Sequence, residues 1–195
     1  MALTPRELKQ KLRQEALARR DALDPRWRIE ASLGFAERAD EIAPPPGTVV
    51  SGFWPILSEV DLRPLMAALR DRGARLCLPA LVDRSTMVFR EFVRGAPLVE
   101  MGFGTKGPGG EAAELQPEMM LVPLAAFDAR GHRIGYGAGH YDRAIDRLQR
   151  LGPSPRLIGI AFDCQEVPEV PNETHDIALP EILTESGLRR FAQPL

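Results

Sequence analysis

The sequence predicts a single α/β domain over residues 1–195, a three-layer sandwich in which helices flank a largely parallel central sheet. From residue 48 onward, strand-like apolar runs alternate with helix-like segments, a pattern typical of parallel sheets with crossover helices. A chain of 195 residues is long enough for one sizeable core and short for two. The 44% hydrophobic and 27% charged residues are typical of a globular protein.

The first element in the chain is a helix that starts after Thr4. Thr4 is placed as N-cap, Pro5 stands at the first helical position, and Glu7 can complete a capping box. The helix then has two faces. The apolar face carries Leu8, Leu12 and Ala16, and the basic face carries Lys9, Arg13 and Arg20.

A second helix is predicted from Pro25 to about Ile42, because Asp24 and Pro25 restart the helical pattern and the run Pro44-Pro45-Pro46-Gly47 ends it. After that break we expect strands over 48–54, 74–79, 87–93, 119–123 and 156–162, helices over 62–72 and 139–151, and a short edge strand over 188–191. The glycine-rich and proline-rich stretch 95–117 is predicted to be an ordered loop over the functional site. Ligands of such sheets bind at the carboxyl ends of the strands.

Composition and charge restrict the classes of function. The net charge of −2 gives no electrostatic basis for nucleic acid as a partner. The first 28 residues carry eight Lys or Arg and four Asp or Glu, which suits a phosphate ligand or simply a solvated basic face. No stretch reaches the ~20 apolar residues of a membrane helix, and the N-terminus lacks a signal-peptide core. We therefore expect a cytoplasmic protein with a small-molecule substrate, either monomer or homodimer.

The two cysteines, Cys77 and Cys164, have no metal-binding spacing and are expected to be reduced and packed.

Gly135, Gly137 and Gly139 stand at alternate positions directly before a predicted helix. Glycine leaves room for an anion beside main-chain N–H groups, and a helix N-terminus adds a positive end. The spacing is neither GxGxxG nor a Walker loop, so a plain glycine-rich turn is the alternative.

The residues around these glycines resemble those of the 5-formyltetrahydrofolate cyclo-ligase family. The block that carries the resemblance comprises Pro123, Phe127, Asp128, Gly131, Arg133, the loop glycines and Tyr141-Asp142-Arg143. Three further elements match in order: Lys9-x-x-Leu12-Arg13, Glu59-Val60-Asp61 and His175-Asp176. The resemblance implies ATP-dependent cyclisation of 5-formyltetrahydrofolate to 5,10-methenyltetrahydrofolate, with ADP and phosphate released. ATP would phosphorylate the formyl oxygen, and N10 would then attack the activated carbon.

The same resemblance implies roles for individual residues. ATP would be bound by Lys9, Arg13, Arg133, Ile134, Gly135, Tyr136, Gly137, Ala138, Gly139, His140 and Tyr141. Among these, Arg133, His140 and Tyr141 would be catalytic. The folate would be bound by Trp54, Glu59, Tyr136 and His140, because a carboxylate can accept two adjacent pterin N–H groups and an aromatic ring can stack. Asp142 and Asp176 would hold Mg²⁺.

Each of these residues also has an ordinary structural role open to it. Lys9 and Arg13 could lie on a solvated helix face, Asp142 could cap a helix, and Glu59 could be a surface residue. Trp54 could be plain core.

The chain departs from the family pattern at several positions. His140 stands where many members have tyrosine, and some members carry Arg or Lys in place of Tyr136 and Ala138. An imidazole in the site predicts a steeper pH dependence near neutrality. The segment 105–108 also differs, and its Lys106 could contact the glutamate carboxylates of a folate or be a mobile loop residue.

Two alternatives to the ligase therefore stay open: a catalytically impaired folate- or nucleotide-binding module, and a sugar-phosphate isomerase or CoA-transferase-like enzyme, which can share the architecture.

Overall fold

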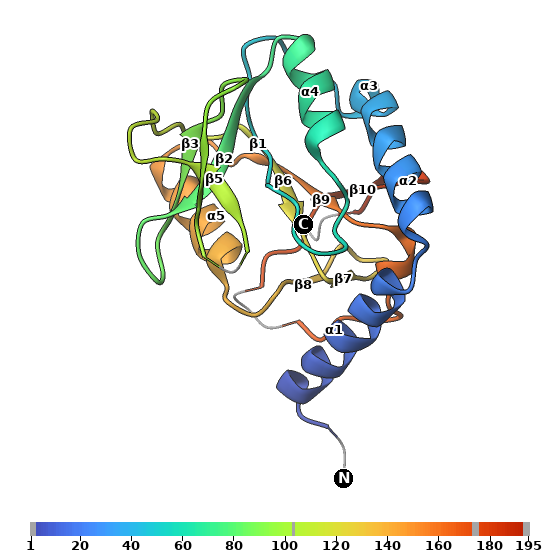
Figure 1. Ribbon diagram of the computed structural model, residues 1–195. Helices are drawn as coiled ribbons and strands as arrows, with labels where there is room; N and C mark the ends of the chain where they lie inside the picture. The colour runs from blue at the N-terminus through green and yellow to red at the C-terminus, as the bar shows by residue number, and fades with distance from the viewer. Residues whose placement is uncertain (1–2, 103, 173–175, 193–195) are drawn as a thin grey trace.

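A seven-stranded sheet forms the centre of the computed structural model, which describes residues 3–102, 104–172 and 176–192 (Figure 1). The strand order is β11-β10-β9-β6-β1-β2-β3. The strands are β1 (Val49–Ser51), β2 (Arg75–Leu81), β3 (Met87–Glu91), β6 (Met119–Pro123), β9 (Arg156–Ile160), β10 (Glu181–Thr184) and β11 (Gly187–Arg190). The five inner strands pair in parallel, and both edge strands pair antiparallel to their neighbours. The predicted largely parallel sheet is confirmed.

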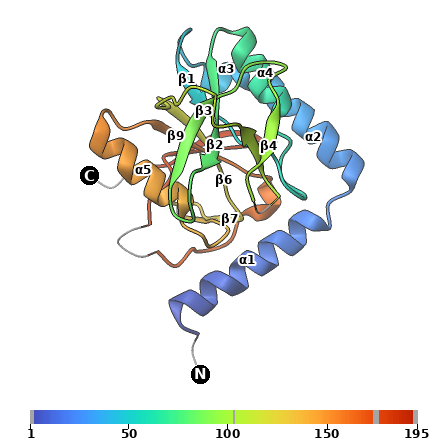
Figure 2. The ribbon, with the colours of Figure 1, turned by 60° about the vertical axis from the view of Figure 1, so that its left-hand side comes forward.

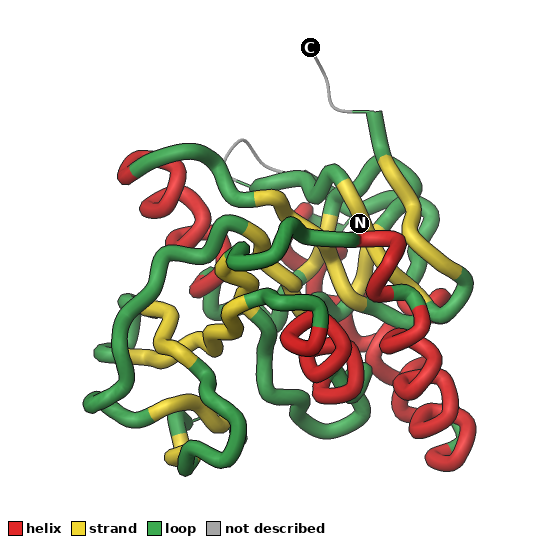
Figure 3. The backbone as a smooth tube through the Cα atoms, turned by 90° about the horizontal axis from the view of Figure 1, so that it is seen from above, coloured by secondary structure: helices red, strands yellow, loops and turns green. Residues whose placement is uncertain are grey.

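Helices cover both faces of the sheet, as the three-layer prediction requires. The helices α2 (Pro25–Glu37), α3 (Ala39–Ile42) and α4 (Arg63–Asp71) lie on one face, and α5 (His140–Leu151) lies on the other (Figure 2). Alternate residues of one strand serve the two faces: Leu76 and Leu78 pack in the core with α2 and α4, whereas Cys77 packs in the core with α5. Figure 3 shows helices on either side of the strands from a second direction.

The helix α1 (Pro5–Asp21) lies outside these two layers (Figure 1). It begins as predicted, with Thr4 and Glu7 forming a capping box. Its residues Leu12 and Ala16 pack against a separate apolar cluster that includes Ala126 and Ile134. These two come from the hairpin of β7 (Ala126–Phe127) and β8 (Arg133–Ile134). The apolar face of α1 is therefore bound to the segment that leads into the glycine loop, which positions the rest of the helix beside that loop.

The bounds of one predicted helix and one predicted strand were wrong, whereas those of two other helices were close. The helix predicted over 25–42 breaks at Arg38, which separates α2 from α3. The strand predicted over 48–54 keeps only three residues, since the chain leaves the sheet after Ser51. The helices predicted over 62–72 and 139–151 match α4 and α5 to within a residue at each end, which is the usual uncertainty of helix ends.

The structure adds strands that the sequence did not predict. The stretch 95–117, expected to be an ordered loop, contains a hairpin of β4 (Leu98–Glu100) and β5 (Lys106–Pro108). The inner strand β10 was missed as well. It begins with Glu181, whose carboxylate binds the guanidinium of Arg156 at 2.6 Å. The predicted edge strand near the C-terminus is confirmed as β11, and a short 3-10 helix spans Asp163–Gln165.

Both cysteines are free, with Cys77 buried and Cys164 partly buried. Within residues 3–102, 104–172 and 176–192, no helix is long and apolar enough to cross a membrane.

Candidate active site

Two cavities meet at the glycine loop, which we define as residues 135–139. The apolar cavity, about 380 Å³, is lined by side chains that include Trp54, Pro79, Met101 and Tyr141. The polar cavity, about 700 Å³, is lined by side chains that include Lys9, Arg13, Arg143 and Asp176. Five residues line both cavities: Arg133, Gly135, Ala138, Gly139 and Asp142. A ligand in one cavity can therefore touch a ligand in the other across this loop.

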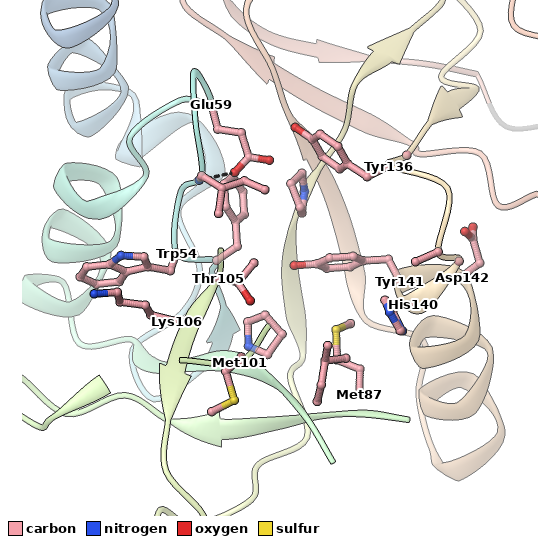
Figure 4. Close-up of a pocket in the computed structure, with 18 of the residues that line it drawn as sticks. Trp54, Glu59, Met87, Met101, Thr105, Lys106, Tyr136, His140, Tyr141 and Asp142 are labelled. Atoms are coloured by element: carbon pink, nitrogen blue, oxygen red, sulfur yellow. Dashed lines mark hydrogen bonds between the residues drawn. The ribbon is translucent and has the colours of Figure 1, made fainter. Parts of the chain in front are cut away.

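The apolar cavity lies at the carboxyl ends of the strands, as expected for an open parallel sheet. Trp54 follows β1, Pro79 lies near the end of β2, and Pro123 ends β6. The hairpin of β4 and β5 closes another side with Met101, Thr105 and Lys106 (Figure 4). Part of the stretch 95–117 therefore lines this cavity, and its place over a functional site stays a prediction.

The glycine loop has the backbone that its sequence predicts. Gly137 and Gly139 have φ of +102° and +66°, a region that residues with a Cβ rarely adopt. Gly139 is the N-cap of α5 and offers no side-chain acceptor to the first amides of that helix. The N-terminus of α5 therefore presents donors and the positive end of its dipole at the shared wall. This arrangement suits an anion.

Basic side chains reach the polar cavity from two elements. From α1, the Nε of Arg13 donates to the Gly135 carbonyl at 2.8 Å, and the Lys9 Nζ lies 2.5 Å from Asp176 Oδ2. The Arg133 guanidinium, on β8, donates to Asp142 Oδ1 at 2.7 Å and to the Ile177 carbonyl. The structure therefore brings together Lys9, Arg13 and Arg133 as predicted, and a solvated helix face does not describe the first two.

Two carboxylates, Asp142 and Asp176, line the same polar cavity and are each paired with a basic side chain. The described residues contain no group of three or more His, Cys, Asp or Glu side chains placed to hold a metal. Two carboxylates are nevertheless a suitable protein donor set for Mg²⁺ bound to a nucleotide, since that ion takes its other ligands from phosphate and water. His175, which accompanied Asp176 in the sequence pattern, lies outside the described residues.

Glu59 lies in the apolar cavity and not on the surface. Its Oε2 accepts the Ile56 amide at 2.9 Å. Burial raises the pKa of Glu59, while the Tyr136 hydroxyl, the Ile56 amide and the charge of Arg20 act in the opposite direction. Figure 4 shows Glu59 and Tyr136 facing each other from different segments of the chain.

Trp54 lies at the edge of the same cavity and is partly buried. Its ring makes an edge-on contact with Phe92, with centroids 6.3 Å apart, and the Arg63 guanidinium lies 5.4 Å above it. The indole is thus fixed by the protein on some sides and still contributes surface to the cavity.

The aromatic and imidazole groups predicted to be catalytic lie at the start of α5. The Tyr141 hydroxyl is buried and has no hydrogen-bond partner among the described residues, and burial raises its pKa. It is therefore a protonated donor without an acceptor. The His140 Nδ1 lies 3.1 Å from Arg143 Nη2, and burial together with that charge lowers the pKa of His140.

Two residues combine burial with a place near the site. Ile134, predicted to bind the cofactor, lines the polar cavity, while its side chain is 2% exposed and belongs to the apolar cluster under α1. Arg20 was assigned to the basic face of α1 and to no site, yet it is 2% exposed and donates to the Tyr136 hydroxyl at 2.7 Å. The sequence signal for the place of Arg20 near the site was its spacing from Arg13, because residues seven apart lie on the same face of a helix.

Comparison with known proteins shows the family of the chain. The sequence model of the 5-formyltetrahydrofolate cyclo-ligase family matches residues 5–185. The 5-formyltetrahydrofolate cyclo-ligase of Escherichia coli K12 is 32% identical over 177 residues, covering 86% of this chain and 95% of that protein. The enzyme of the same name from Mycolicibacterium smegmatis is 30% identical over 151 residues, covering 71% and 74%.

Solved structures agree with the fold. The NMR structure of Aquifex aeolicus 5,10-methenyltetrahydrofolate synthetase has a TM-score of 0.78 at 27% identity, covering 96% of this chain and 95% of the other. The synthetase of the same name from Mycoplasma pneumoniae has a TM-score of 0.70 at 22% identity, over 89% and 96%, and supports the fold alone. The match over nearly the whole length, together with the two cavities joined at the glycine loop, shows that the chain belongs to the 5-formyltetrahydrofolate cyclo-ligase family.

Proposed function

We propose that the protein converts 5-formyltetrahydrofolate into 5,10-methenyltetrahydrofolate and cleaves ATP to ADP and phosphate. The observation that carries this proposal is the shared wall of the two cavities at the glycine loop. One cavity has an apolar lining and the Glu59 carboxylate, which suit a pterin, and the other has the basic side chains suited to phosphates. The reaction needs those two ligands in contact at one point.

The folate would occupy the apolar cavity with its pterin ring at Glu59. A carboxylate there accepts two adjacent pterin N–H groups in a bidentate manner. Trp54 would contribute an aromatic face to the ring system or its aminobenzoyl group. Tyr136 faces Glu59 and lines the same cavity. These contacts bind and orient the substrate without taking part in bond changes.

The nucleotide would place its phosphates in the polar cavity. Lys9 and Arg13 reach it from α1, Arg133 reaches it from β8, and the amides at the start of α5 complete the anion site. Phosphoryl transfer depends mainly on such positioning and on neutralising the developing charge. Asp142 and Asp176 are the residues that would hold Mg²⁺, which would supply further positive charge to the phosphate oxygens.

The proposed reaction has two steps. The formyl oxygen attacks the γ-phosphorus, the bond to the ADP oxygen breaks, and the formyl carbon becomes electrophilic with a phosphate leaving group. N10 then attacks that carbon, the carbon–oxygen bond breaks, phosphate departs, and N10 loses its proton. The Tyr141 hydroxyl, a buried donor without a partner among the described residues, is suited to the formyl or phosphate oxygen. His140 would donate to the same oxygens, and Arg133 would offset the phosphate charge.

A direct assay tests the proposal. The protein is incubated with 5-formyltetrahydrofolate and Mg²⁺, with and without ATP, and the methenyl chromophore and ADP are measured together. We expect both products to appear in equal amounts and only with ATP. Folate binding without ADP release would instead indicate an impaired binding module, and absence of folate binding would indicate a different phosphate-handling enzyme. We further expect the protein to act in the cytoplasm, which fractionation would test.

A further inference from the structure

Arg20 is a buried arginine to which the catalytic proposal assigns no role. Arg20 lies near the end of α1 and is 2% exposed. The Nε donates to the Ser58 hydroxyl at 2.9 Å, and the Nη1 donates to the Tyr136 hydroxyl at 2.7 Å. A guanidinium is costly to bury, so one retained at such a position must be held by specific partners.

The two partners of Arg20 belong to two different segments of the chain, each of which contributes residues to the lining of the apolar cavity. Ser58 directly precedes Glu59 in the segment after β1, whereas Tyr136 belongs to the glycine loop. The Ser58 hydroxyl in turn donates to the Asp21 carboxylate. The guanidinium therefore ties the segment that carries Glu59 to the loop that carries Tyr136, and both are anchored to α1.

The hydrogen bond from Arg20 also sets the direction of the Tyr136 hydroxyl. A phenolic oxygen has one proton and can accept further hydrogen bonds. Because the oxygen accepts from Arg20, its proton is free to point away from the guanidinium, toward the side on which the Glu59 carboxylate faces it (Figure 4). The positive charge of Arg20 also opposes the rise in the pKa of Glu59 that burial causes. Both effects favour an ionised, fixed acceptor in the cavity.

We propose that Arg20 is a positioning residue for folate recognition, which holds Tyr136 and Glu59 in the geometry that accepts the pterin ring. It touches neither the nucleotide site nor the reacting atoms. Lys9 and Arg13, on the same helix, line the polar cavity instead, so one helix serves both ligands through different residues. This inference rests on the proposed function.

The test compares Arg20→Gln with Arg19→Gln, a matched control on the neighbouring position. Arg19 donates to the Cys164 and Glu166 carbonyls at 2.7 and 3.0 Å, away from both cavities. The control therefore also loses two hydrogen bonds from α1. We expect Arg20→Gln to raise the KM for 5-formyltetrahydrofolate about tenfold or more, the usual effect of losing a hydrogen bond from a charged group. The KM for ATP should stay within about twofold, since separate sites contribute independently.

The pH profile provides a readout that a merely structural role would not change. The charged and titratable groups that face Glu59 are Arg20 from α1, Tyr136 from the glycine loop and Tyr141 from α5. Burial raises the pKa of both tyrosines, so they stay protonated. Loss of the Arg20 charge should therefore move the acid limb of kcat/KM for the folate to higher pH. Arg20→Lys, which keeps the charge, should restore that limb while recovering the KM only in part.

The outcomes separate this inference from the proposed function. An active wild-type protein whose Arg20→Gln variant matches Arg19→Gln in folate KM and pH profile would overturn the role of Arg20 alone. A wild-type protein that produces no methenyl product would overturn both. If Arg20→Gln fails to fold, Ser58→Ala replaces it and should raise the folate KM by about threefold, because it removes one neutral partner of the guanidinium. An unchanged folate KM in that variant would count against the inference.

Discussion

Replacing Glu59 by glutamine should weaken folate binding strongly while leaving the fold intact. Glutamine has nearly the same shape and keeps one oxygen, so the bond from the Ile56 amide, 2.9 Å in the structure, can persist. The second oxygen becomes an NH₂ group that faces a pterin N–H donor. A hydrogen bond to a charged group contributes about 1.5–3 kcal/mol. Loss of a bidentate pair therefore costs about 3 kcal/mol or more, on the order of 100-fold in affinity.

Equilibrium titration of 5-formyltetrahydrofolate into each variant measures this effect directly. Glu91→Gln is the matched control, because Glu91 binds Arg75 at 2.8 Å at the edge of the sheet and lines neither cavity. Thermal unfolding of both variants checks that the fold is unchanged. If Glu59→Gln binds the folate within about threefold of wild type, which is less than one ordinary hydrogen bond, then Glu59 is not the pterin acceptor.

Three other predictions follow from the site and the cysteines. Asp142→Ala should reduce kcat far more than folate affinity, because Asp142 lines both cavities and pairs with Arg133 at 2.7 Å; equal loss of both in a folded variant would remove it from the metal role. His140→Tyr should flatten the pH–rate profile on the acid side, since the lowered pKa of His140 places its protonation below the usual 6.5; a profile identical to wild type would show that this titration does not matter. Burial raises the pKa of the Cys77 thiol to about 12, so a thiol reagent at pH 8 should modify native protein only at Cys164; rapid reaction of two thiols would contradict that burial.

Local signals in the sequence were sufficient for the elements around the glycine loop. The capping box at Thr4, the strand β6 and the start of α5 were all predicted within a residue. Each depends on interactions between near neighbours: a cap, a buried apolar run, and glycines with φ of +102° and +66°. The predicted anion site follows the same rule, because it depends on the backbone amides of a glycine loop directly before a helix.

Features that depend on contacts between distant segments could not be predicted in this way. The strand β5 contains Gly107 and Pro108, which have low strand propensity, and Gly107 lies close to the Pro79 carbonyl of β2, a distant segment. The strand β10 begins with Glu181, a charged residue that does not indicate a strand in the sequence. In the structure its carboxylate binds the Arg156 guanidinium. A charged residue at an inner strand becomes possible only with that partner.

Arg20 illustrates the same limit within the site. The sequence placed it with Lys9 and Arg13 on the basic face of α1 but gave no sign that it would be buried. Its burial depends on the end of α1 lying against the segment of Ser58 and on Tyr136 reaching the same point. These tertiary contacts join Arg20 to two residues that lie 38 and 116 positions further along the chain. The prediction of a nucleotide site, by contrast, used the resemblance of Lys9, Arg13 and the glycine loop to the family pattern.

Diffraction from crystals grown with 5-formyltetrahydrofolate and a non-hydrolysable ATP analogue would test the central claim most directly. We predict the terminal phosphate at the first amides of α5, between Arg133 and the formyl oxygen, with the pterin ring against Glu59. A terminal phosphate bound outside the polar cavity, or a folate whose formyl group points away from the glycine loop, would contradict the account.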